Sequence, residues 1–149
     1  MNKFRLVKFN EQDDYNFVYE LKKLAYKKYV EKFFGAWNEQ QQLDMYKAFL
    51  EERKNNIKII IIDNKKAGFI DGKIIDEITY EQGNICLAPE FQGQGIGTKL
   101  LQNIFKTYRN KNIKLRVFKT NPAKKLYERL GFITCDETTA HYVMLKKQI

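Results

Sequence analysis

The stretch that most constrains the fold lies at residues 84–98, where a short apolar strand leads into a glycine-rich turn and then a helix. The apolar strand ends before Pro89, and Gly93, Gly95 and Gly97 follow closely. Glycines let the backbone turn tightly and approach a ligand without a Cβ in the way. The first turn of a helix offers N–H groups and a positive dipole end. A strand, such a turn and a helix in this order favour phosphate binding.

The spacing of the glycines decides between several phosphate-binding motifs. A dinucleotide-binding turn has Gly-x-Gly-x-x-Gly with an acidic residue about twenty positions later, but Thr98 stands where the third glycine belongs and the later residue is not acidic. A P-loop has Lys and then Ser or Thr directly after its last glycine, whereas here Thr98 precedes Lys99. The pattern that remains is Gln-x-x-Gly-x-Gly, formed by Gln92, Gly95 and Gly97.

A second motif lies at residues 117–132, where Asn121-Pro122-Ala123 is followed by Leu126-Tyr127 and by Gly131-Phe132. The two motifs together resemble the coenzyme A signatures of the GNAT superfamily of N-acetyltransferases. One detail departs from the family pattern, because Ala123 follows Asn121 by two positions rather than three. The order of the expected elements also resembles the family, so the resemblance covers nearly the whole chain.

The resemblance implies an acetyl-CoA-dependent N-acetyltransferase that transfers an acetyl group to a primary amine by direct attack in a ternary complex, with no covalent enzyme intermediate. It also implies an α/β (α+β) fold: one domain over residues 1–149, with a mixed, mostly antiparallel sheet of about seven strands flanked by about four helices. The length of 149 residues fits one domain with a sizeable core.

Local patterns place these elements along the chain. Helical spacing of apolar residues predicts two helices before residue 57, the first running to about Lys28 and the second spanning residues 38–53. Aromatic residues follow the first helix up to Trp37. Asp71-Gly72 is interpreted as a turn. The other expected elements are strands at 4–7, 57–62, 67–70, 78–87, 113–118, 132–135 and 141–145, a helix after the glycine turn, and a helix that stops at Gly131.

The composition limits the classes of protein to which the chain can belong. Hydrophobic residues make up 44% and charged residues 30% of the chain, which argues against disorder. The longest aliphatic run, at residues 59–62, is far too short for a membrane span, and the N-terminus lacks a signal-peptide apolar region. We therefore expect a soluble, cytoplasmic protein without membrane association.

The charged and sulfur-containing residues narrow the choice of ligands. The net charge is +9, but the lysines are spread along the chain without a nucleic-acid signature, so no nucleic acid partner is expected. The excess charge favours a polyanionic ligand such as coenzyme A. Cys86 and Cys135 are expected to be reduced, buried strand residues. With His141 the only histidine and no Cys-x-x-Cys spacing, no metal site is expected.

The resemblance also implies which residues hold acetyl-CoA. The main chain near Leu87 and Ala88 would hold the pantetheine arm and the acyl oxygen, the backbone of a run beginning at Gln92 would take the pyrophosphate, and Asn121 would bond the pantetheine arm. The pyrophosphate run comprises Gln92, Gly93, Gln94, Gly95, Ile96, Gly97 and Thr98.

Chemistry assigns the remaining roles. A tyrosine hydroxyl at the sulfur can protonate the departing thiolate, the role that the resemblance gives to Tyr127. The resemblance places the general base in the strand entering the turn, where the nearby residues are Asn84, Glu81 and Glu77; Glu81 could act directly or through water, and His141 is a further candidate. No carboxylate directly precedes Ile85.

Acceptor contacts are assigned to Trp37, Asn84 and His141, with a core position for Trp37 as the other interpretation. The acceptor itself, a small-molecule or peptide amine, cannot be read from the sequence, and a homodimer is possible. Two alternatives stay open. One is a catalytically weak acyl-CoA-binding sensor or interaction module of the same fold, and the other is a basic domain associated with nucleic acid.

Overall fold

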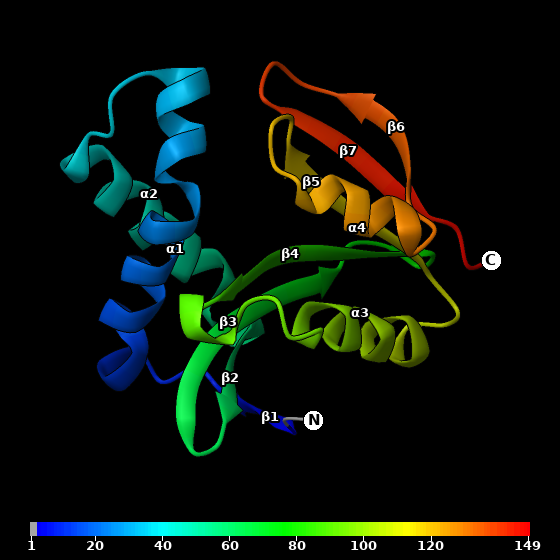
Figure 1. The fold of residues 1–149 in the computed structure, drawn as a ribbon, viewed down its shortest axis with the longest axis horizontal. Coiled ribbons are helices and arrows are strands. Elements are labelled where there is room, and N and C mark those ends of the chain that lie inside the picture. Colours follow the sequence, from blue (N-terminus) through cyan, green and yellow to red (C-terminus); the bar gives the residue numbers. More distant parts are fainter. Residues whose placement is uncertain (1–2) are drawn as a thin grey trace. The chain divides into compact units, whose positions relative to one another are not determined.

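The computed structural model describes residues 3–149, which divide into two compact units. The first unit comprises the residues up to Asp71 together with Asn84–Gln92, and the second comprises Gly72–Gly83 and Gly93–Ile149. The strands β3 (Lys65–Ile74) and β4 (Thr79–Leu87), labelled in Figure 1, are therefore each divided between the two units. The elements are β1 (Phe4–Lys8), α1 (Glu11–Phe34), α2 (Glu39–Arg53), η1 (Lys54–Asn56), β2 (Ile57–Ile62), β3 (Lys65–Ile74), β4 (Thr79–Leu87), η2 (Pro89–Phe91), α3 (Ile96–Thr107), β5 (Asn112–Phe118), α4 (Ala123–Arg129), β6 (Ile133–Glu137) and β7 (His141–Lys146).

The strands form a seven-stranded mixed sheet in the order β1-β2-β3-β4-β5-β7-β6. Antiparallel pairing joins β1 to β2, β2 to β3, β5 to β7 and β6 to β7, whereas β4 and β5 pair in parallel over three residues at the start of each strand. With four α-helices, this arrangement confirms the expected fold class.

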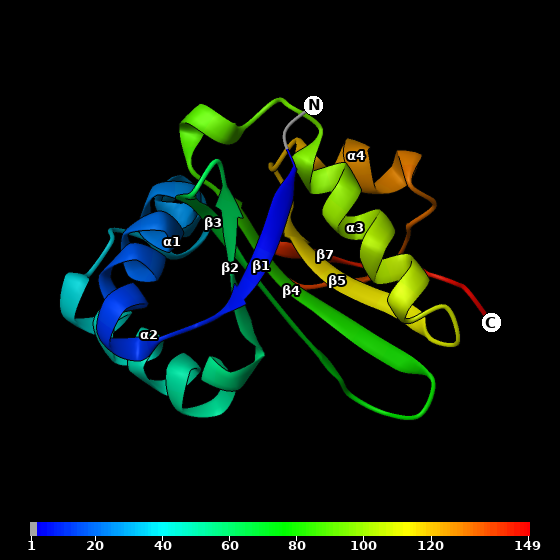
Figure 2. The ribbon, with the colours of Figure 1, turned by 90° about the horizontal axis from the view of Figure 1, so that it is seen from below.

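In the first unit, α1 and α2 cover one face of the strands (Figure 2). Val18 and Leu21 of α1 and Tyr46 of α2 pack with Ile59 and Phe69 in one buried cluster. The β-branched residues of β2 suit a strand that is buried on both faces, as Ile59 and Ile60 on opposite faces are each at most 1% exposed. A tight turn at Asp63-Asn64, both with positive φ, joins β2 to β3.

In the second unit, α3 buries the apolar side that its sequence period predicts: Ile96, Leu100, Leu101 and Ile104. Phe105 of the same helix contacts the ring of Phe132, with 5.9 Å between ring centroids. The side chain of Gln148 donates to three carbonyls near the end of α3. These contacts fix α3, and with it the turn that precedes it, within this unit.

Three local expectations were wrong. The first helix does not end near Lys28 but runs to Phe34, since Gly35, with φ of 101°, is the residue that breaks it. Asp71-Gly72 is not a turn but part of β3, because buried contacts hold the Asp71 side chain within the strand. Cys135 is exposed rather than buried, because β6 is an edge strand whose five residues are all exposed.

Candidate coenzyme A and acceptor site

The glycine-rich turn lies between η2 and α3 of the chain. Gly93 and Gly95 have φ values of 73° and 77°, a left-handed conformation that favours glycine. The first intrahelical hydrogen bond of α3 runs from the Lys99 N–H to the Gly95 carbonyl. The N–H groups of residues 96–98 therefore have no acceptor within the helix. They are donors of the kind that bind phosphate.

Gly97 is informative because nothing within residues 3–149, the part of the chain that the structure describes, explains it. Its φ is not positive, and a Cβ built there would meet no atom within 4 Å. Glycine in the first turn of a helix costs stability relative to alanine. Added Cβ atoms at Gly93 and Gly95 would likewise meet nothing within 4 Å. The backbone of this turn is therefore not covered by side chains, and a diphosphate would fit against it.

The chain before the turn lies in the first unit. The Gln92 side-chain amide donates to the Leu87 carbonyl (2.9 Å), and the Gln92 N–H donates to the Pro89 carbonyl (3.2 Å). The Ala88 N–H donates to the Ala67 carbonyl of β3 (2.8 Å). Gln92 thus closes the loop between β4 and the glycines, so its polar groups shape the turn from within.

The second motif lies in the second unit. Asn121 lies two residues before α4, and its side-chain oxygen accepts the N–H of Ala123, the first residue of that helix (2.9 Å). Tyr127 is half-buried on that helix, and its ring meets the edge of the Phe132 ring, with 5.8 Å between centroids. Gly131, with φ of 98°, ends this segment as expected from its C-cap position.

The two other candidates in the second unit are Glu81 and His141. Glu81 is half-buried on β4, opposite Lys114 of β5 in the parallel pairing. The His141 ring lies against the Phe118 ring, with 4.2 Å between centroids. Burial first, and then the nearby Arg116 charge, lower the pKa of His141, which favours its neutral imidazole.

Trp37 and Asn84 are the acceptor-site candidates of the first unit. The Trp37 ring is partly buried and packs against the core cluster of that unit, as the core interpretation expects. Its indole N–H donates to Glu39 (2.8 Å), which also accepts from Lys23 (3.0 Å). The bond from Trp37, followed by that from Lys23, lowers the pKa of the Glu39 carboxyl.

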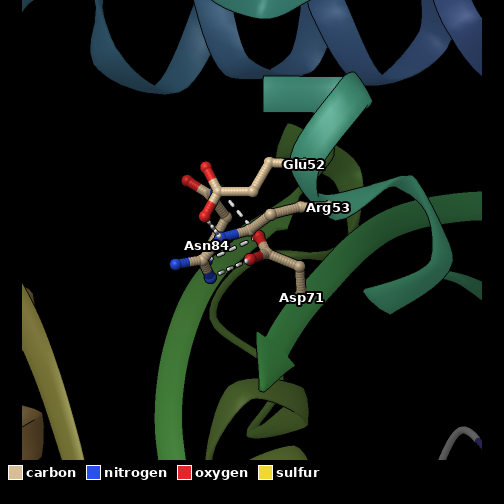
Figure 3. A network of polar contacts seen from close by, with 4 residues as sticks. All are labelled: Glu52, Arg53, Asp71 and Asn84. Carbon is tan, nitrogen blue, oxygen red and sulfur yellow. Dashed lines mark hydrogen bonds and ion pairs between the residues drawn. The ribbon is translucent and has the colours of Figure 1, made fainter. Parts of the chain in front are cut away.

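Asn84 lies against a carboxylate that the sequence analysis did not single out. Asp71 of β3 is 2% exposed, and its Oδ2 accepts both the backbone N–H of Asn84 (2.9 Å) and its side-chain amide (2.6 Å). Arg53 at the end of α2 brings Nη1 to 3.5 Å from Asp71 Oδ1. Figure 3 shows these three side chains turned toward one another, with Glu52 on the side of Arg53 away from Asp71. The Glu52 Oε1 lies 4.0 Å from Arg53 Nε.

Burial dominates the electrostatics of this cluster. It raises the pKa of Asp71, although the two bonds from Asn84 and the nearby charges of Lys22 and Arg53 oppose the rise. Burial also lowers the pKa of Lys22, whose amine lies 3.9 Å from the centre of the Phe49 ring. A carboxylate in this place could not be foreseen from the strand that enters the glycine turn, because it comes from the neighbouring strand β3.

The described residues contain neither an arranged metal site nor a membrane-spanning helix. Among residues 3–149, no group of three or more His, Cys, Asp or Glu side chains is arranged to hold a metal ion. Within the same range, none of the helices combines the length and the apolar character that crossing a membrane requires.

Comparison with known proteins identifies the class. Residues 53–134, more than half of the chain, match the "Acetyltransferase (GNAT) domain" family. The chain therefore belongs to the GNAT acetyltransferase family, which confirms the resemblance seen in the two motifs.

One similar curated protein is the [ribosomal protein bS18]-alanine N-acetyltransferase of Haemophilus influenzae, 35% identical over 95 residues, which are 61% of this chain and 63% of that protein. The chain thus spans less than two thirds of the length of this relative.

Solved structures share the fold over nearly the whole chain. PH1933 from Pyrococcus horikoshii OT3 has a TM-score of 0.74 at 21% identity, covering 100% of this chain and 99% of that one. The PaiA N-acetyltransferase of Thermoplasma acidophilum, solved in complex with coenzyme A, has a TM-score of 0.67 at 21% identity, covering 97% and 99%. At such identities the likeness concerns the fold.

Proposed function

We propose that the protein is an acetyl-CoA-dependent N-acetyltransferase that moves an acetyl group onto a primary amine by direct attack. The observation that carries the proposal is the uncovered glycine-rich stretch at the start of α3, above all Gly97 in the first turn of that helix, which neither its φ nor the packing of the described residues around it requires. A glycine that costs helix stability is explained when a ligand lies against the backbone at that position. Membership of the GNAT family supports acetyl-CoA as that ligand.

In this proposal, the amine nitrogen bonds to the acetyl carbon while the carbon–sulfur bond breaks. The amine loses one proton, and the sulfur leaves as a thiolate that takes up a proton. Main-chain groups near Leu87 and Ala88 would stabilise the charge on the acyl oxygen, Tyr127 would donate the proton to sulfur, and Asn121 would bond the pantetheine arm. Glu81, directly or through water, is the proposed proton acceptor.

The acceptor is proposed only as a class, a primary amine on a peptide or a small molecule. The relative that acetylates an alanine of ribosomal protein bS18 supports including a peptide α-amine among the acceptors to be tested. Trp37, Asn84 and His141 remain the proposed acceptor contacts.

Binding tests the proposal first. Titration calorimetry with coenzyme A should show association, and Gly97→Ala should weaken it by about tenfold or more because the new Cβ would occupy the space of the phosphates. The thermal midpoint of Gly97→Ala should stay the same or rise. Asn103→Ala, an exposed change on the same helix, is the control and should leave affinity unchanged. Equal affinity in wild type and Gly97→Ala would contradict the proposed site.

Turnover tests it next. Incubation with acetyl-CoA and a panel containing an alanine-initiated peptide, a lysine peptide and a polyamine should release free thiol with at least one acceptor. Binding of coenzyme A without turnover on the whole panel would favour the sensor or interaction module. Absence of coenzyme A binding, with salt-sensitive retention on DNA, would favour the basic nucleic-acid-associated domain.

A further inference from the structure

The hydrogen bonds between β3 and β4 reveal an extra residue in β4. At one end the Ala88 N–H donates to the Ala67 carbonyl, and at the other the Ile75 N–H donates to the Thr79 carbonyl. Ala67 and Ile75 are eight positions apart in the sequence, whereas their hydrogen-bond partners Thr79 and Ala88 are nine positions apart. One residue of β4 therefore has no counterpart on β3, which defines a β-bulge, a feature common beside active sites.

The Asp71 side chain binds residue 84 within this stretch of β4. Within the first unit, the Asn84 N–H donates to the Asp71 carboxylate. The Asn84 side-chain amide donates to the same oxygen, so residue 84 is fixed both by its main chain and by its side chain. Hydrogen bonds to a charged acceptor are stronger than those between neutral groups, so these two bonds hold residue 84 against Asp71.

The Asp71 carboxylate is itself held in place. It is 2% exposed, and Arg53 approaches its second oxygen from α2. Burying a charge without a partner is strongly unfavourable, and the guanidinium and the two Asn84 bonds supply partners to this carboxylate. The cluster thus links the end of α2, β3 and residue 84 of β4 by polar contacts.

We propose that Asp71 is a positioning residue, whose carboxylate fixes the course of β4 from Asn84 to Leu87. This inference rests on the proposed function, in which the main chain near Leu87 holds the acyl end of acetyl-CoA. Phosphate binding at the glycine turn does not depend on Asp71 in this scheme. Loss of the carboxylate therefore lowers the rate of acetyl transfer much more than the affinity for coenzyme A.

The test compares Asp71→Asn with a control variant that loses a similar buried carboxylate elsewhere in the same unit. Asp14 is also buried and has the same two kinds of partner: its Oδ2 accepts the Asn10 N–H (2.8 Å) and its Oδ1 lies 2.6 Å from Lys66 Nζ. It stands in the first turn of α1, with no assigned role in acetyl transfer. Asp14→Asn therefore measures the consequence of losing a buried, paired carboxylate in the same unit.

For wild type, Asp71→Asn and Asp14→Asn, the measurements are the thermal midpoint, the Kd for coenzyme A and kcat with the best acceptor of the panel. Both variants should melt earlier than wild type. Only Asp71→Asn should lose kcat, by about 10- to 100-fold, as expected for displaced reacting groups, with its Kd within about twofold of wild type. A kcat for Asp71→Asn equal to that of wild type or of Asp14→Asn would overturn the inference.

A second variant keeps the inference testable if Asp71→Asn does not fold. Arg53→Lys retains a positive charge beside Asp71 but loses the planar guanidinium, and it should lower kcat severalfold without changing the Kd for coenzyme A. An unaltered kcat in that variant would also overturn the inference. A wild-type protein that turns over no acceptor contradicts the proposed function as well, whereas an active wild type with unaffected variants contradicts this inference alone.

Discussion

At the scale of single residues, the role of Tyr127 depends on its hydroxyl group. Tyr127→Phe removes that group and keeps the ring that contacts Phe132, so the protein should remain folded. We predict a loss of kcat of about 10²- to 10⁴-fold, the usual contribution of a general acid, with little change in the Kd for acetyl-CoA. Rates of thiol release and calorimetry provide the two measurements, and a wild-type rate in the variant would exclude Tyr127 from the chemistry.

The two cysteines should differ in reactivity. Cys86 is 3% exposed, and its Sγ lies 3.4 Å from the Tyr26 hydroxyl. Burial raises the pKa of its thiol to about 12, so the reactive thiolate is scarce at pH 7–9. Cys135 is exposed. We predict that iodoacetamide modifies Cys135 alone in the native protein at both pH 7 and pH 9, as measured by mass spectrometry of its peptides.

The matched control for this prediction is the protein unfolded in denaturant, in which both cysteines should react. Modification of native Cys86 at a rate close to that of Cys135 would show that β4 opens readily, and it would contradict the buried environment described for that thiol.

Residues that act through local geometry could be predicted from the sequence, but residues that act through contacts between strands could not. The glycine turn was recognisable because the backbone requirement and the residue type stand at the same positions. Asp71 was missed because an Asp-Gly pair is typical of turns, and nothing local indicates that Arg53 and Asn84 keep this one inside a strand. The assignment of Glu81 as the general base remains a prediction.

At the scale of elements, the close approach of β3 and β4 depends on Gly68. An added Cβ there would collide with the Cys86 carbonyl oxygen and lie 3.1 Å from the Leu87 Cα. Both neighbours are backbone, so one strand must shift. We predict that Gly68→Ala lowers the free energy of unfolding by about 1–3 kcal/mol or more, as measured by denaturant titration.

The same substitution at Gly97 is the control, because a Cβ there meets nothing within 4 Å. Gly97→Ala should leave the free energy of unfolding unchanged or increase it by up to about 1 kcal/mol. If the two alanine variants were equally stable, the tight contact between β3 and β4 at Gly68 would not exist in solution.

Element type was predicted better than element limits. Apolar period and glycine positions correctly indicated α3 and the end of α4, because both depend on neighbouring residues in the chain. The longer α1 and the exposure of β6 depend on which surfaces other elements cover. Tyr29 is buried whereas Phe34, five residues later in the same helix, is 64% exposed, and a run of aromatic residues alone does not distinguish the two.

At the scale of the whole molecule, the property most relevant to the proposed ligand is the net charge of +9. Several cations already have acidic partners, among them Lys66 with Asp14 and Lys23 with Glu39. At a distance the two charges of such a pair cancel. A ligand therefore experiences the electrostatic field of the net positive charge rather than that of individual cations. Such a field attracts polyanions and raises association rates, and it weakens as salt screens it.

This field predicts a salt dependence that separates the phosphates from the acyl arm. The affinity for acetyl-CoA should fall severalfold between about 0.05 M and 0.5 M NaCl, because the screening length shortens from above 10 Å to below 5 Å over this range. Acetyl-pantetheine carries the same thioester without phosphates, so its weaker binding, measured by competition or calorimetry, should change little. A common salt dependence for both ligands would mean that charge does not steer the phosphates toward the turn before α3, and the open glycines would then have to bind them through hydrogen bonds alone.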